Sequence, residues 1–270
     1  MKKGFGMEFI FIGLLLIISL GLLQSPNFAV VAIVSIGLLQ YHLVLLLHEC
    51  VHSTLHPNRT LNHIVGKLSG ALIFISFENY QKEHWAHHRE SATTADPDFY
   101  IYNYQGPLTV PRILYWIFWR GLVEVKQKQR TKGLLATTHL GGTLSIVLAQ
   151  LLIFFGLMFA LKLSLFSTLL SYIMLWAFPL LAVAFFINRS RIIFEHGFGI
   201  LHNNGIDLIG VPKIVRCFLF PFSFNYHHTH HLYPHTPSYQ LQRLSLENVT
   251  NKVHVKSYVT EVLCAHQKGH

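Results

Sequence analysis

Eight histidines lie in three short clusters whose spacing suits the binding of metal ions. They are His48 and His52; His84, His87 and His88; and His227, His230 and His231. On a helix, residues three or four apart share a face. The first and penultimate histidines of each three-histidine cluster are therefore expected to point one way, and the last one about 100° away. Imidazole is a ligand of Zn, Cu, Fe and Ni. Eight rings exceed the three or four protein ligands of a zinc site, so the sequence favours two ions with positions left open for oxygen.

Other histidines lack this spacing, and we interpret them as ordinary amphipathic residues at a membrane interface. They are His42, His56, His63, His139, His202, His254, His266 and His270. Two more, His228 and His235, lie inside or beside the last cluster, and the spacing leaves their role open.

The elements that must position these clusters are predicted to be membrane helices. Hydrophobic residues make up 51% of the 270 residues and charged residues only 12%, against about a quarter charged in soluble proteins. Since a crossing helix needs about 20 apolar residues, we expect an all-α integral membrane protein with four spans, in one domain covering residues 1–270. The predicted spans are residues 8–23, 28–47, 143–161 and 165–187. Residues 64–77 and 108–123 are weaker apolar stretches, predicted to be interfacial or re-entrant helices.

The distribution of lysine and arginine predicts the orientation, because positive residues that flank spans stay in the cytoplasm. Two lie at the N-terminus, ten between residues 48 and 135, and eight after residue 188, whereas the opposite side has only Lys162. Both termini and all three clusters, in the segments 48–135 and 188–270, are therefore expected to be cytoplasmic. This basic side could contact anionic lipid or attract an acidic electron donor or acyl carrier.

The three clusters resemble the histidine boxes of the membrane fatty acid desaturase superfamily, which also contains hydroxylases and ketolases. Those boxes have the forms HxxxH, HxxHH and HxxHH and surround a non-haem diiron centre. The flanking residues agree as well, with Asp96-Pro97-Asp98 after the second box, and Asn225-Tyr226 before and Leu232-Tyr233-Pro234 after the third.

The resemblance implies a cytosolic helical cap that holds two iron ions, with a ninth ligand between the last span and the third box. His196, preceded by Arg191 and Glu195, fits that ligand, although Ile192 stands where some desaturases have an asparagine. The implied ligands are His48, His52, His84, His87, His88, His196, His227, His230 and His231, with no catalytic residue separate from them. Ligand histidines usually donate their second N–H to a carboxylate or carbonyl, and adjacency suggests Glu49, Asp98, Glu195 and Asn225 for this role.

The implied activity is O₂-dependent desaturation of an acyl chain; the alternative is hydroxylation or ketone formation on a lipid, alkane or carotenoid. Cys50, Cys217 and Cys264 form no CxxC pair, and the chain has no haem or dinucleotide motif. Electrons are therefore expected from a separate ferredoxin, rubredoxin or cytochrome. No nucleic acid partner is expected.

Two other classes of function remain open. His48, Glu49 and His52 also spell HExxH, the zinc protease motif in which the glutamate is the general base, but a protease leaves both later clusters unexplained. A metal transporter would place polar ligands inside its spans, whereas the predicted spans contain only His42.

Overall fold

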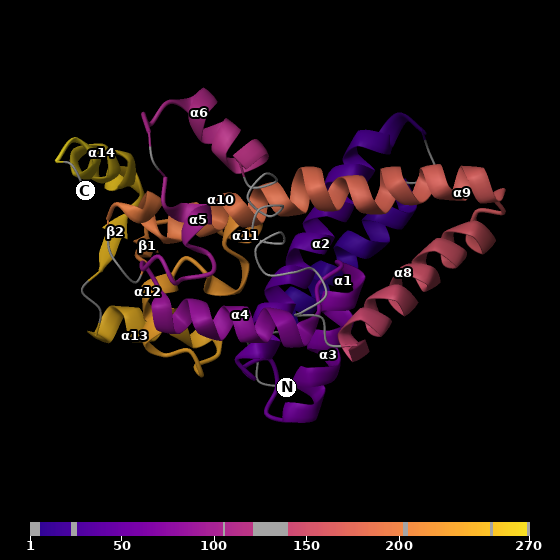
Figure 1. The fold of residues 1–270 in the computed structure, drawn as a ribbon, viewed down its shortest axis with the longest axis horizontal. Coiled ribbons are helices and arrows are strands. Elements are labelled where there is room, and N and C mark those ends of the chain that lie inside the picture. The colour runs from indigo at the N-terminus through magenta and orange to yellow at the C-terminus, as the bar shows by residue number, and fades with distance from the viewer. Residues whose placement is uncertain are drawn as a thin grey trace. The chain divides into compact units, whose positions relative to one another are not determined.

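The computed structural model describes residues 6–22, 26–104, 106–120, 140–201, 205–248 and 251–268 of a mostly helical chain (Figure 1). The chain divides into two compact units. Unit 1 combines Met1–Tyr80 with Thr138–Ile187, and unit 2 combines Gln81–Thr137 with Asn188–His270. Several sequence-based predictions lie outside the described residues: the end of the first span at Leu23, the stretch 121–135, and His139, His202 and His270.

Unit 1 contains the apolar helices. They are α1 (Gly6–Leu22), η1 (Pro26–Phe28), α2 (Ala29–Val51), α3 (Arg59–Leu72), α8 (Leu140–Ala160), α9 (Leu165–Tyr172), η3 (Ile173–Ala177) and η4 (Leu180–Ala184), and α10 (Phe185–Glu195) continues into unit 2. Three helices among the described residues are long and apolar enough to cross a membrane: Ala29–Val51, Leu140–Ala160 and the continuous run Leu165–Glu195. They correspond to three of the four predicted spans. The first predicted span forms α1, which has 17 residues, and a fourth crossing stays a prediction.

The helix from Leu165 to Glu195 changes register around a proline. Two π-helical segments, η3 and η4, lie on either side of Pro179. Proline has no N–H to donate and its ring displaces the preceding turn, and local π-type turns can satisfy the backbone groups that a proline leaves free in a membrane helix. The helix therefore continues through Pro179 and ends at Glu195.

Three polar side chains in unit 1 bond to groups on neighbouring helices. The amide of Gln40 donates to the carbonyl of Trp176 at 2.8 Å, and the amide of Gln150 donates to the carbonyl of Ala71 at 2.7 Å. The hydroxyl of Tyr172 donates to Gln150 at 2.7 Å. Since water is absent from the hydrocarbon region, such bonds between helices satisfy groups that would otherwise be costly to bury.

The predicted helix at 64–77 corresponds to the second part of α3 and ends earlier than expected. α3 ends at Leu72, α4 (Phe77–Glu90) begins at Phe77, and the two are bent by 101°. The break contains Phe74 at a φ of +62°, a conformation that a helix cannot include. α3 exposes Leu61, Ile64 and Leu68, which agrees with an apolar face for lipid.

Unit 2 contains short elements around the later histidine clusters. They are the end of α4, α5 (Phe99–Tyr102), α6 (Val110–Tyr115), η2 (Trp116–Arg120), η5 (Gly197–Gly199), β1 (Asp207–Ile209), α11 (Lys213–Leu219), η6 (Pro221–Ser223), α12 (His227–Leu232), α13 (Ser238–Asn248), β2 (Lys252–His254) and α14 (Val255–Gln267). α6 and η2 cover most of the predicted helix at 108–123, and residues 121–123 lie outside the described residues.

The expectation of an all-α chain is wrong in one detail. β1 and β2 form a parallel pair in which Asp207 is opposite Lys252 and Ile209 is opposite His254 (Figure 1). Three-residue strands carry too little alternation to be recognised in the sequence. The pair ties the segment before the third histidine cluster to the segment before α14.

Candidate metal centre

Four histidines of unit 2 converge on one point. They are His87, His196, His227 and His231, here called the His196 cluster, and one ring nitrogen from each lies within 4.8 Å of the others. The Nε2 atom of His227 is 3.0 Å from Nε2 of His196 and 3.0 Å from Nε2 of His231. Two imidazoles that bind one ion at right angles, with bonds of about 2.0–2.1 Å, would place their nitrogens about 2.9 Å apart. The arrangement therefore has the spacing of a ligand set.

Burial supports the same conclusion. His196 and His227 are 1% and 4% exposed, and Nδ1 of His196 has no hydrogen-bond partner among the described residues. Burial holds the pKa values of His196, His227 and His231 well below the usual histidine range, and neighbouring charges lower them further. Neutral imidazole is the form that binds metal. Buried rings that face one another gain little stability by themselves, so the residues present fit a metal ion.

A second group, His84, His88 and His230, forms the His84 cluster in the same unit. Nε2 of His84 lies 3.1 Å from Nε2 of His88, and the ring centroids of His88 and His230 are 4.9 Å apart. Burial and the neighbouring His87 lower the pKa of His88 to about 3. The low pKa keeps His88 neutral, and the three rings form a second potential ligand set.

The two HxxHH motifs divide their histidines between these clusters in the same way. In α4, His84 and His88 belong to one cluster and His87 to the other; in α12, His227 and His231 stay together while His230 leaves them. The sequence-based expectation that the first and penultimate rings point one way is thus wrong. Residues four apart are separated by about 40° around a helix and residues three apart by about 60°, so the first and last rings pair.

His48 and His52 lie in unit 1, at the end of α2. Each is 2% exposed, and their ring centroids are 4.8 Å apart because the two residues are one turn apart. This pair belongs to a different unit from the later clusters. Its role as a pair of metal ligands therefore stays a prediction.

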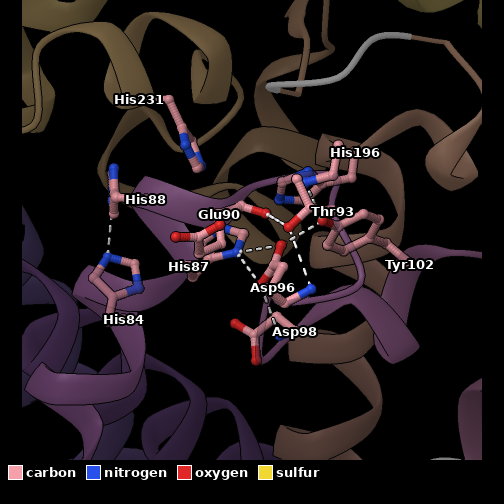
Figure 2. A network of polar contacts seen from close by, with 12 residues as sticks. His84, His87, His88, Glu90, Thr93, Asp96, Asp98, Tyr102, His196 and His231 are labelled. Carbon is pink, nitrogen blue, oxygen red and sulfur yellow. Dashed lines mark hydrogen bonds and ion pairs between the residues drawn. The ribbon is translucent and has the colours of Figure 1, made fainter.

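Asp96 is the carboxylate that the structure places against His87. Nδ1 of His87 lies 2.9 and 3.0 Å from the two oxygens of Asp96, as Figure 2 shows. Burial opposes protonation of His87, but the bond to Asp96 and the charges of Asp98 and Asp96 raise its pKa. The sequence had suggested Asp98 for a role of this kind. The backbone N–H of Asp98 donates to Asp96 at 2.7 Å, and this turn, typical of an aspartate accepting from the residue two positions on, was the signal that could have identified Asp96.

Glu195 is the predicted carboxylate that lies beside a cluster histidine. It is fully buried, accepts from Arg191 Nη1 at 2.5 Å, and its Oε2 is 3.5 Å from Nδ1 of His227. The guanidinium of Arg191 also lies over the ring of Phe224, 4.9 Å from its centroid. Burial raises the pKa of Glu195 to about 7, although the neighbouring Arg191 opposes this shift. Arg191 therefore holds the Glu195 carboxyl group beside the ring of His227.

The other two predicted partners have different contacts. Glu49 Oε1 is 4.0 Å from Nδ1 of His48, while its other oxygen accepts from the Thr54 hydroxyl at 2.8 Å. Asn225 donates to the carbonyl of Leu208 at 2.9 Å, so its amide fixes the turn before α12.

Asp207 is a further positioning residue that the sequence did not reveal. This fully buried carboxylate accepts from the backbone N–H of Thr229 at 2.9 Å, from the Thr229 hydroxyl, and from Ser245 at 2.6 Å. Thr229 lies in the middle of the third cluster, so Asp207 fixes the helix turn that carries three ligand candidates. The sequence signal for this region is the threonine at position 229, which stands between four histidines.

The histidines outside the clusters have separate contacts. Nδ1 of His228 is 3.3 Å from the Asn251 amide, and His235 is exposed beside Trp85. Nδ1 of His42 bonds to the carbonyl of Leu38 at 2.8 Å. Others cap or pack: His56 and His254 accept from backbone N–H groups, and His63 packs edge-on against Phe77.

Comparison with known proteins agrees with this geometry. The sequence model for the fatty acid desaturase family matches residues 25–258. The chain is also similar to a beta-carotene ketolase from Paracoccus sp. (strain PC1), with 25% identity over 226 residues that cover 81% of this chain and 79% of the ketolase. Both comparisons point to a membrane diiron oxidoreductase of the desaturase and ketolase kind, and they favour it over a protease or a transporter. The chain belongs to the fatty acid desaturase family.

Proposed function

We propose that this protein is an O₂-dependent membrane desaturase that introduces a double bond into an acyl chain. The observation that carries the proposal is the pair of histidine clusters, which gathers buried and half-buried imidazole rings from α4, the end of α10 and α12 into two potential ligand sets. Iron bound there would supply the oxidation of an unactivated C–H bond by O₂.

The protein's own residues would hold and orient these ions. Asp96 holds the ring of His87 by a bond to Nδ1, and Glu195 lies 3.5 Å from Nδ1 of His227. Such outer contacts maintain ligand orientation and basicity. We propose His48 and His52 as further ligands on the strength of their spacing and the family match.

Electrons must reach the site from another protein. We propose a small acidic donor of the ferredoxin, rubredoxin or cytochrome type, attracted by the basic segments that we expect on the cytoplasmic side. Electrostatic steering weakens with salt. Turnover with limiting donor should therefore fall as ionic strength rises, and turnover with saturating donor should fall much less.

Ketone or alcohol formation on a carotenoid is the second candidate, favoured by the similarity to the beta-carotene ketolase. The two candidates share the histidine clusters and differ in how the substrate is held. Similarity at this level supports the superfamily rather than the product.

The deciding experiment is expression in a host that lacks both activities, with and without β-carotene production, followed by mass spectrometry of lipids and pigments. Acyl chains that have lost two hydrogens support the desaturase, and pigments that have gained oxygen support the second candidate. His227→Gln should abolish either product, and His235→Gln, an exposed ring outside both clusters, should retain it. Wild-type protein that lacks iron, or turns over equally after iron removal, would contradict both candidates.

A further inference from the structure

Tyr102 is linked to two members of the His196 cluster by two different parts of its side chain: its ring stacks on His196, and its hydroxyl bonds to Asp96, the partner of His87. It is the last residue of α5, and it is only 1% exposed. Figure 2 shows its hydroxyl beside Asp96 and its ring beside His196.

The hydroxyl of Tyr102 is connected to His87 by hydrogen bonds through Asp96. It donates to Oδ2 of Asp96 and accepts from the backbone N–H of Ala92 at 2.9 Å. Because the Ala92 N–H occupies the acceptor side, the hydroxyl hydrogen is directed at the carboxylate. Asp96 in turn holds Nδ1 of His87 at 2.9 Å. Tyr102, Asp96 and His87 thus form one chain of hydrogen bonds that ends at a ligand candidate.

The ring of Tyr102 stacks directly on the ring of His196. The two rings are nearly parallel, with an interplanar angle of 11° and centroids 4.0 Å apart. An aromatic plane at that distance blocks rotation of the imidazole on one side. His196 has no hydrogen-bond partner at Nδ1 among the described residues, so the stack on Tyr102 takes the place of the carboxylate contact that His87 receives from Asp96.

The backbone around Tyr102 is anchored on both sides. Trp116 Nε1 donates to the carbonyl of Ile101 at 2.8 Å, and the backbone N–H of Tyr104 donates to Phe198 at 3.3 Å. Gly199 lies so close that a Cβ there would be 3.2 Å from the carbonyl oxygen of Tyr102. α5 and η5, the turn that follows His196, are therefore held together, and the tyrosine ring cannot drift from the imidazole.

We propose that Tyr102 is a positioning residue that fixes the ring orientations of His87 and His196 together, so that both rings direct a nitrogen at the same ion. The proposal rests on the proposed function, because it takes the His196 cluster as a metal site. It goes beyond it by assigning to one phenol side chain the coupling of two ligands that come from different helices.

The test separates the hydroxyl from the ring. Tyr102→Phe keeps the stack on His196 and removes the bond to Asp96, whereas Tyr102→Leu removes both. The matched control is Tyr104→Phe, because Tyr104 is also buried, at 6% exposed, and its hydroxyl donates to the carbonyl of Pro107 at 2.6 Å, away from the cluster. Each purified variant is titrated with Co²⁺, and its visible spectrum and thermal midpoint are recorded.

We expect Tyr102→Phe to weaken one of two Co²⁺ sites by about 10–100-fold, the usual effect of losing an outer contact to a ligand histidine, and to shift the Co²⁺ spectrum. Tyr102→Leu should weaken the same site further. Tyr104→Phe should lower the thermal midpoint without changing Co²⁺ affinity or spectrum. If both phenylalanine variants lower the midpoint alike and leave Co²⁺ binding unchanged, Tyr102 only packs and the proposal is overturned.

Two outcomes keep the test decisive. If the wild-type protein binds neither Co²⁺ nor iron, the proposed function itself fails, which differs from a failure of Tyr102 alone. If Tyr102→Phe does not fold, 3-fluorotyrosine placed at position 102 of the otherwise unchanged chain gives a ¹⁹F resonance. That resonance should shift when Zn²⁺ is added, and an unchanged resonance with Zn²⁺ bound would contradict the proposal.

Discussion

Gly205 leaves room for His227. A Cβ at Gly205 would lie 2.8 Å from Cδ2 of His227 and 3.1 Å from the carbonyl oxygen of Glu195, and the residue has a φ of +78°. Glycine alone adopts this backbone conformation without strain. The turn before β1 can therefore pass between the end of α10 and a ring of the His196 cluster.

Replacement of Gly205 by alanine should displace the His227 ring. We expect Gly205→Ala to reduce Co²⁺ affinity of one site by about 10-fold or more, because a displaced ligand costs at least as much as a lost outer contact. The control is Gly156→Ala on α8, where a Cβ meets nothing within 4 Å and alanine favours a helix by up to about 1 kcal/mol. Equal metal binding by both variants would show that His227 is not held against this turn.

The carboxylate that orients His87 can be identified by paired substitutions. Asp96→Asn removes the charged acceptor 2.9 Å from Nδ1 of His87, and we expect a loss of about 10–100-fold in metal affinity. Asp98→Asn should have a smaller effect, since the Asp98 backbone bond to Asp96 remains. Metal titration of the two purified variants tests the order, and a larger loss for Asp98→Asn would assign the role to that residue instead.

The sequence predicts the ligand candidates better than it predicts their partners. Regular spacing identified the histidines of α4 and α12 because a helix repeats over a few residues. The sequence did not predict the roles of Asp207 and Asp96. Asp96 contacts its partner across a turn, and Asp207 lies 22 residues before its partner Thr229. The parallel pair of β1 and β2 escaped for the same reason, since non-local pairing of three-residue strands leaves no periodic pattern.

Each HxxHH motif contributes histidines to both clusters. This division predicts which double substitutions remove one bound ion and which remove both. His227→Gln and His231→Gln should each remove one bound ion per chain, and the double variant should still retain the other ion. His230→Gln combined with His231→Gln should remove both ions, although the residues are neighbours. Two substitutions in the same ligand set are not expected to have additive effects on metal content. Iron and Co²⁺ content per chain measures the outcome, and the opposite pattern would place His227 and His230 in the same ligand set.

The bond between Thr229 and Asp207 should contribute to stability as well as to the metal site. Thr229→Val keeps the shape of the side chain but loses the hydroxyl bond to a buried carboxylate, which is expected to lower the free energy of unfolding by about 1.5–3 kcal/mol. Thermal or denaturant unfolding in detergent measures the change. Ser257→Ala, which removes a bond to Glu261 on a more exposed face of α14, should stay within about 0.5 kcal/mol.

Glu49 distinguishes the proposed oxidoreductase from a zinc protease. In an HExxH protease this glutamate is the general base, and Glu49→Gln should abolish activity. In the present structure Glu49 accepts from the Thr54 hydroxyl and lies 4.0 Å from His48. A glutamine can still accept the threonine bond, so we expect Glu49→Gln to retain part of the lipid oxidation activity and nearly all of the bound iron. His52→Gln, at a predicted ligand, should instead lower the iron content. Product analysis and iron content of the two variants provide the measurement, and complete loss of activity in Glu49→Gln with iron retained would give Glu49 a direct chemical role.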